Sequence, residues 1–185
     1  MRNNPFSIFF IIFLVLILLI SSGCSAANQQ TTDPLKNLQK FALVTIEHPN
    51  ITAPTFTLTD DKGNKFTSSD LKGKVYILQG FAPGCSSCAR EIATLNKVYS
   101  KFHDKGLEII SLDVASDDIS GAISTKKQFN GGDWRWTVDL DNVAVKFAIR
   151  TLESTYIIDK DGMIRYKDEI ISDPDVLSQE IEKMI

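Results

Sequence analysis

The chain is poor in cysteine and histidine and has no long run of basic residues. Its 185 residues include three cysteines and two histidines. A structural zinc site needs four ligands, commonly two cysteine pairs or one pair with two closely spaced histidines, and His48 and His103 lack that spacing. No structural metal site is therefore expected. The net charge of −3, without a block rich in lysine and arginine, argues against nucleic acid as a partner.

Acidic residues are absent from the first 32 positions, which carry an apolar run instead. The run from Phe6 to Ile20 is apolar except for Ser7, follows Arg2 and precedes the small residues of "SSGC". A charged start, an apolar middle and a small-residue exit are typical of a secretory signal. We expect residues 1–23 to be a signal peptide or membrane anchor, residues 24–50 a polar tether and residues 51–185 the folded domain.

The "SSGC" stretch resembles a bacterial lipoprotein signal, in which the cysteine after the cleavage site receives lipid and becomes the new N-terminus. That resemblance makes Cys24 the lipidation site. The alternative is an uncleaved N-terminal helix in which Cys24 is merely a small residue. Both alternatives place the domain at the extracytoplasmic face of the cell membrane.

Strand and helix patterns alternate through the rest of the chain. The order is a hairpin, a βαβ unit, a second hairpin and a closing helix, which predicts one central sheet covered by helices. Trp134 and Trp136, which flank Arg135, are expected to be divided between core and surface. Strands are predicted at 55–60, 65–70, 74–81, 107–114, 134–140, 154–159 and 163–168, and helices at 88–102, 116–129, 142–149 and from Asp173 onward.

The stretch "FAPGCSSCARE" (81–91) holds the two remaining cysteines, Cys85 and Cys88, three positions apart. A purely structural bridge across two residues would close too small a loop to add much stability. Disulfide chemistry also suits an extracytoplasmic location. These points favour a pair that is oxidised and reduced over a metal site or a structural disulfide.

A strand ending in "FAxxCxxC" that runs into a helix, about seventy residues before "STYIIDKDG", resembles the thioredoxin-like redoxins. In particular it resembles the TlpA/ResA-type membrane-tethered thiol–disulfide oxidoreductases, which share a sequence family with the peroxiredoxins (AhpC/TSA). The resemblance covers roughly residues 51–185. It implies an enzyme with an α/β thioredoxin-like fold: a central mixed sheet flanked by helices, with an N-terminal β-hairpin extension. It also implies exchange with protein thiols and disulfides, a membrane electron donor of the DsbD/CcdA type and no diffusible cofactor.

Three residues of the motif receive roles in this interpretation. Unpaired N–H groups and the dipole at the start of a helix favour a thiolate, which makes Cys85 the attacking sulfur. Cys88, one turn further along, is placed to resolve the mixed disulfide. Glu91 stands where ResA-like proteins carry an acid near the disulfide and would accept a proton, unless it is only a solvated helix carboxylate.

The chain departs from the family pattern at several positions. Glu153 stands where thioredoxin-like proteins normally have a cis-proline that faces the disulfide and pairs with the substrate backbone. We expect a trans peptide bond there, and we assign substrate docking to Glu153 and Ser154. Gly84 stands where the family usually has tryptophan, and Ser86 and Ser87 replace the usual proline-containing pair.

Two other functions stay open. "APGC" resembles the "TPGC" of some bacterioferritin-comigratory-type peroxidases, an antioxidant class, with Cys85 as the peroxidatic cysteine and Cys88 as the resolving one. Ala82, however, lacks the threonine hydroxyl that orients the peroxide. An SCO-like copper-handling protein also has a tethered thioredoxin-like domain, but it uses CxxxC and a distant histidine. Two soft thiolates would still bind Cu(I).

Overall fold

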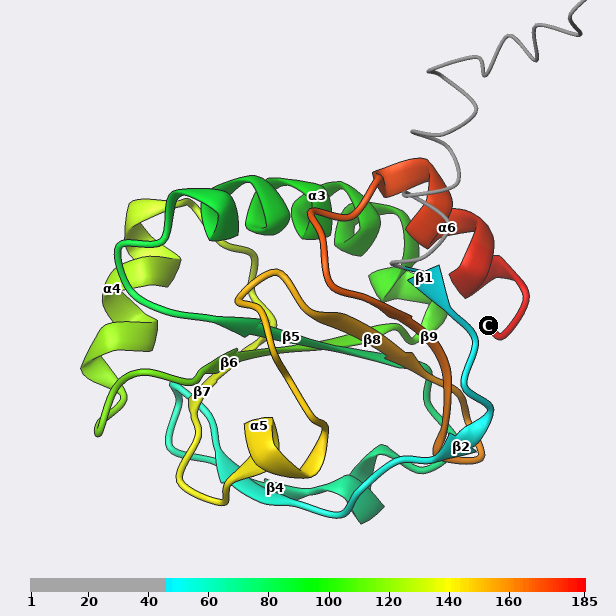
Figure 1. Cartoon of the computed structure of the whole chain (residues 1–185), viewed down its shortest axis with the longest axis horizontal. Helices are drawn as coiled ribbons and strands as arrows, with labels where there is room; N and C mark the ends of the chain where they lie inside the picture. Colours follow the sequence, from blue (N-terminus) through cyan, green and yellow to red (C-terminus); the bar gives the residue numbers. More distant parts are fainter. Residues whose placement is uncertain (1–45) are drawn as a thin grey trace, which may run out of the picture. The chain divides into compact units, whose positions relative to one another are not determined.

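The computed structural model describes residues 46–185, which form a central sheet with helices on both faces (Figure 1). The predicted signal or anchor segment, Cys24 and most of the predicted tether lie outside the described residues. The strands are β1 (Ile46–Glu47), β2 (Ile51–Thr52), β3 (Thr57–Thr59), β4 (Lys65–Thr67), β5 (Tyr76–Phe81), β6 (Glu108–Asp113), β7 (Arg135–Val138), β8 (Thr155–Ile158) and β9 (Met163–Asp168). The helices are α3 (Ser86–Phe102), α4 (Ser120–Gln128), α5 (Val143–Lys146) and α6 (Pro174–Glu182), with 3-10 turns η1 (Ser68–Leu71) and η2 (His103–Lys105). No helix within this part of the chain is long and apolar enough to cross a membrane.

The main sheet is mixed, as predicted. Its strand order is β1-β9-β8-β5-β6-β7, and β2 also pairs with β9. β5 pairs in parallel with β6, and β6 with β7, whereas β8 is antiparallel to both β5 and β9. Ile46 and Glu47 of β1 pair with the end of β9. A segment that the sequence assigned to the tether therefore contributes an edge strand to the sheet.

Two apolar layers hold helices and hairpin to this sheet. β5 is buried along its whole length, as its apolar sequence predicts. α3 and α6 cover one face, while α5 and the β3–β4 hairpin cover the other (Figure 1). The hairpin turns at Gly63, whose φ of +82° lies in the left-handed region that glycine adopts most readily. This hairpin is the predicted N-terminal extension.

The expectation that Trp134 and Trp136 would be shared between core and surface is wrong, because both side chains are buried. Their rings stack with centroids 5.6 Å apart. Gly131 and Gly132 pack so closely against the two indoles that a β-carbon at either position would collide with a ring. Each indole N–H also donates a hydrogen bond inside the protein. The backbone of Gly131 and Gly132 therefore covers the indole rings that the strand pattern predicted to be partly exposed.

Candidate active site

Cys85 and Cys88 form a disulfide at the junction of β5 and α3. Cys85 is the N-cap of α3, with its Cα 5.3 Å from that of Cys88. The backbone N–H of Cys88 donates to Cys85 Sγ over 3.1 Å. This amide belongs to the first turn of α3, where N–H groups have no acceptor within the helix, so the sulfur serves as its acceptor. Cys88 is completely buried, whereas Cys85 is partly exposed. Of the two cysteines, Cys85 is therefore the one that a large partner can reach. Its sulfur can be attacked by a partner thiolate or, once reduced, can attack a partner disulfide.

The residues around Cys85 shape its environment. Ser87 Oγ lies 3.2 Å from Cys85 Sγ, and because a disulfide sulfur carries no hydrogen, the Ser87 hydroxyl is the donor. Gly84 has a φ of +77°, a left-handed conformation that glycine adopts readily. It lies in the turn directly before Cys85, the N-cap of α3. The sequence did not reveal either contribution, since Ser87 and Gly84 stood out only as departures from the family pattern.

The loop before β8 touches the buried sulfur. Cys88 Sγ lies 3.8 Å from the carbonyl oxygen of Leu152. The peptide bond before Glu153 is trans, as predicted. Glu153 is partly exposed, but Ser154 is fully buried, and its carbonyl accepts from the Gly80 N–H over 3.1 Å. Of the two residues assigned to docking, Ser154 ties the loop to β5, and only Glu153 reaches solvent.

Glu91 is buried behind the disulfide and is not a solvated helix carboxylate. It lies one helical turn after Cys88, on the same face of α3. Its Oε1 accepts from the Thr155 hydroxyl over 2.9 Å, and its Oε2 accepts from the Ser172 N–H over 2.7 Å. Burial raises the pKa of Glu91, with a smaller contribution from the negative charge of Glu153, while the hydrogen bonds oppose the rise.

A second buried acid, Asp168, lies next to Glu91 and was not singled out by the sequence. It ends β9, and its Oδ2 accepts from the hydroxyl of Tyr166 over 2.6 Å and from the hydroxyl of Ser172 over 2.8 Å. Burial raises the pKa of Asp168 to about 7, and the charge of Glu91 contributes to the rise. The ordinary signal for such a residue, a charged position on the inward side of an alternating strand, was present in "MIRYKD".

Acidic, histidine and cysteine side chains do not gather into a metal site in the described part of the chain. Within residues 46–185, no group of three or more of them is arranged to hold an ion. The reactive groups that the structure brings together at this site are the two sulfurs, the two buried carboxyl groups and the hydroxyls that bind them.

Comparison with known proteins agrees with this arrangement. The AhpC/TSA family matches residues 49–167. The thiol-disulfide oxidoreductase ResA of Bacillus thuringiensis (strain Al Hakam) is 33% identical over 115 residues, which cover 60% of this chain and 64% of that protein. ResA of Bacillus subtilis (strain 168) is 28% identical over 113 residues, covering 60% and 62%. The match thus spans slightly less than two thirds of these curated relatives.

Solved structures show the same fold. The thioredoxin domain of a thiol-disulfide oxidoreductase from Bacteroides vulgatus superposes with a TM-score of 0.63 at 27% identity, covering 72% of this chain and 95% of that domain. A thiol:disulfide interchange protein from Bacteroides sp. gives a TM-score of 0.62 at 25% identity, covering 72% and 88%. The fold is therefore thioredoxin-like, as predicted, and the chain belongs to the AhpC/TSA family.

Proposed function

We propose that the protein is a thiol–disulfide oxidoreductase that exchanges disulfides with protein thiols through Cys85 and Cys88. One observation carries the proposal: the two cysteines are bonded at a helix N-terminus, with one sulfur partly exposed and the other completely buried. This asymmetry suits a pair in which one sulfur meets the partner and the other completes the exchange from inside. The ResA relatives, named thiol-disulfide oxidoreductases, support the same activity.

In the reducing direction the reaction has two displacements. The Cys85 thiolate attacks a sulfur of the substrate disulfide, which forms a mixed disulfide and releases the first substrate thiolate. Cys88 then loses its proton and attacks Cys85 Sγ, which closes the protein disulfide and releases the second substrate thiolate. Two electrons pass from the cysteine pair to the substrate, and the oxidising direction is the reverse.

The structure offers Glu91 as the acceptor of the Cys88 proton. Glu91 lies one turn along α3 from Cys88, away from bulk water. A buried carboxylate with a raised pKa is a stronger base than an exposed one, so it accepts a proton from a thiol more readily. Glu91 is therefore assigned to proton transfer, and Glu153 to the surface that meets the substrate.

The test is insulin reduction by the full-length chain in detergent micelles, with dithiothreitol as the reductant. Cys85→Ser should lower the rate to that of dithiothreitol alone, whereas Cys88→Ser, reduced beforehand and freed of dithiothreitol, should still attack insulin and accumulate a mixed disulfide that mass spectrometry detects. Ser86→Ala, a change at an exposed position of the same turn, is the matched control and should stay active. Full activity of Cys85→Ser would overturn the assignment.

The peroxidase alternative is separated by the same protein. The loop carries Ala82 and so supplies no threonine hydroxyl to orient a peroxide, and turnover of hydrogen peroxide should be slow compared with disulfide exchange. A fast, saturable peroxidase reaction that passes through a Cys85 sulfenic acid would favour the peroxidase over the oxidoreductase.

The location of the domain is also a proposal. We propose that residues 1–23 direct the chain to the membrane and are then removed, that lipid attached to Cys24 tethers the protein to the extracytoplasmic face of the cell membrane, and that a membrane thiol transporter of the DsbD/CcdA kind supplies electrons. The apolar run before "SSGC" and the resemblance to ResA-type proteins support it. In bacteria fed a labelled fatty acid, Cys24→Ser should lose the label. Label-free wild-type protein of full-length mass would instead indicate an uncleaved anchor.

A further inference from the structure

The buried side of the disulfide contains two carboxyl groups that are connected to each other. Ser172 binds both, because its N–H donates to Glu91 Oε2 and its hydroxyl donates to Asp168 Oδ2. A second connection runs through the sheet, since Thr155 pairs with Asp168 in the β8–β9 register and donates its hydroxyl to Glu91 Oε1. Both carboxyl groups are at least 99% buried.

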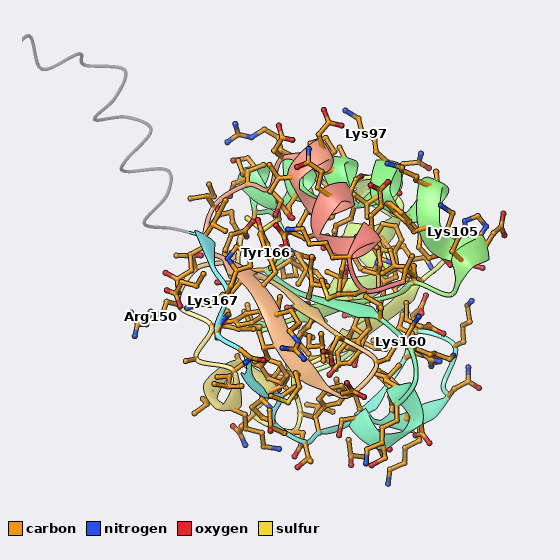
Figure 2. The ribbon with its side chains drawn as sticks, turned by 90° about the vertical axis from the view of Figure 1, so that its right-hand side faces the viewer. Lys97, Lys105, Arg150, Lys160, Tyr166 and Lys167 are labelled. Atoms are coloured by element: carbon orange, nitrogen blue, oxygen red, sulfur yellow. A yellow bond between two sulfur atoms is a disulfide. The ribbon has the colours of Figure 1, made fainter. Side chains whose placement is uncertain are left out.

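No lysine or arginine side chain in the described part of the chain neutralises this pair. Neither carboxyl group forms an ion pair with lysine or arginine anywhere in residues 46–185. Lys167 precedes Asp168 on β9, but its side chain lies on the opposite face of the sheet from Tyr166 (Figure 2). It forms an ion pair with Glu169 instead. The titratable groups around the pair are Glu153 from the loop before β8, Tyr166 from β9, Glu180 from α6, and His48, whose ring lies edge-on to Tyr166 with centroids 5.9 Å apart.

The hydrogen bonds distinguish the two carboxyl groups. Both oxygens of Glu91 accept hydrogen bonds, which suits a carboxylate. On Asp168 only Oδ2 accepts, from two hydroxyls, while Oδ1 is buried without a partner among the described residues. Two neighbouring carboxylates in a site without a cation repel each other, so one of them retains a proton. Asp168 Oδ1 is the atom left to hold it.

We propose that Asp168 is a positioning residue for the exchange reaction: of the two carboxyl groups that Ser172 connects, Asp168 retains the single proton of the pair, and by holding it keeps Glu91 ionised beside Cys88. This inference rests on the proposed function, because it gives Glu91 the Cys88 proton to accept. When Cys88 is deprotonated, the proton moves from its Sγ to Glu91, and the thiolate attacks Cys85 Sγ. Above the pH at which Asp168 ionises, the second negative charge changes the basicity of Glu91.

The test follows the two carboxyl groups directly. In the full-length chain, purified in detergent micelles and labelled with ¹³C in its acidic side chains, the Asp168 carboxyl carbon is titrated by NMR. In Glu91→Gln, the Asp168 titration should move down by about one pH unit or more, because a negative neighbour is removed. The matched control is Glu169→Gln, which removes the next carboxylate along the chain and should leave the Asp168 titration in place. An unmoved Asp168 in Glu91→Gln would overturn the proposal.

A second variant covers the case in which Glu91→Gln does not fold. In Asp168→Asn, which keeps an oxygen that can accept from Tyr166 and Ser172, the Glu91 titration should lose its upper step. Retention of the upper step would equally overturn the proposal, because it would show that Glu91 titrates independently of Asp168.

The pH profile of the exchange reaction tests whether the pair acts on Cys88. Release of product from the mixed disulfide should change in rate through the upper titration of the pair in the wild type, and Asp168→Asn should remove that change. Coupled titrations with identical rate profiles would show that Asp168 does not position Glu91 for the reaction. Failure of the wild type to exchange disulfides at all would instead refute the proposed function, and the carboxyl titrations would still report on the pair.

Discussion

Cys88 Sγ lies 3.8 Å from the carbonyl oxygen of Leu152, although the two residues are 64 positions apart in the chain. The contact brings the loop before β8 onto the buried sulfur, at the place where thioredoxin-like proteins carry their cis-proline. Glu153 follows Leu152 directly in this loop, and its charge contributes to the raised pKa of Glu91. A residue with a negative side chain therefore stands in this loop where the family pattern has an uncharged one.

Glu153→Gln should lower the pKa of the Cys85 thiol in the reduced protein. The wild-type carboxylate opposes the formation of a thiolate nearby, and its removal favours the charged form by a few tenths of a pH unit to about one unit. The measurement is the ultraviolet absorbance of the thiolate against pH. Glu153→Asp, which keeps the charge, is the control. A titration that is the same in Glu153→Gln and wild type would mean that Glu153 points away from Cys85.

Ser87→Ala should raise the pKa of the Cys85 thiol. The Ser87 hydroxyl lies 3.2 Å from Cys85 Sγ, and a hydrogen bond to the charged form of an acid favours that form. A hydrogen bond to a charged group is worth roughly 1.5–3 kcal/mol, so the expected rise is about one to two pH units. Ser86→Ala changes the exposed neighbour and should leave the titration in place. Equal shifts in both variants would indicate a general effect on the helix end.

Gly84→Ala should destabilise the protein even though there is room for the added carbon. A β-carbon at Gly84 would meet no atom within 4 Å, but the φ of +77° is unfavourable for an L-residue by roughly 1–2 kcal/mol. Gly84→Asn should cost less, because asparagine tolerates the left-handed region better than alanine. Urea unfolding of the two variants measures the difference. Equal stability of Gly84→Ala and wild type would show that the turn relaxes to another conformation.

The fold was largely predictable because its elements carry strong local patterns. β9 and the start of α6 lie where the sequence placed them: "MIRYKD" alternates along Met163–Asp168, and Asp173 caps the helix that begins at Pro174 by accepting from two backbone N–H groups. α3 begins at Ser86, two residues before the predicted start at residue 88, because the polar first turn is capped by Cys85. The apolar period of a helix does not predict where a cysteine sulfur caps its first turn.

The site was predictable only where the motif is local. Cys85, Cys88 and Glu91 lie within one stretch of seven residues, and their spacing on a helix brings them to one end and one face. Asp168 joins them from the end of β9, through a chain reversal that brings Ser172 over both acids. Such a connection depends on tertiary packing, which no periodicity in the sequence encodes.

Asp168→Asn should flatten the dependence of folding stability on pH. The pKa of Asp168 is raised to about 7 in the folded protein, against about 4 for an unfolded chain. Between these values the folded protein keeps a proton that the unfolded chain has released, so the free energy of unfolding falls as the pH rises from about 4 to about 7. The three-unit difference corresponds to a fall of up to about 4 kcal/mol. Asp168→Asn removes this contribution, while Glu91 retains a part of the slope.

Asp159→Asn provides the control of opposite sign for this prediction. Although burial raises the pKa of Asp159, hydrogen bonds from the Met163 N–H and the Arg165 side chain outweigh it, so the pKa lies below its usual value. A carboxyl group with a lowered pKa stabilises the folded protein above about pH 4, and this stabilisation is lost as the pH falls below that value. Asp159→Asn should therefore lose stability at neutral pH and approach the wild type in acid. Urea unfolding of the oxidised protein from pH 3 to pH 8 measures all three curves. Parallel curves for Asp168→Asn and wild type between about pH 4 and pH 7 would mean that Asp168 ionises in the folded state like an exposed carboxyl group.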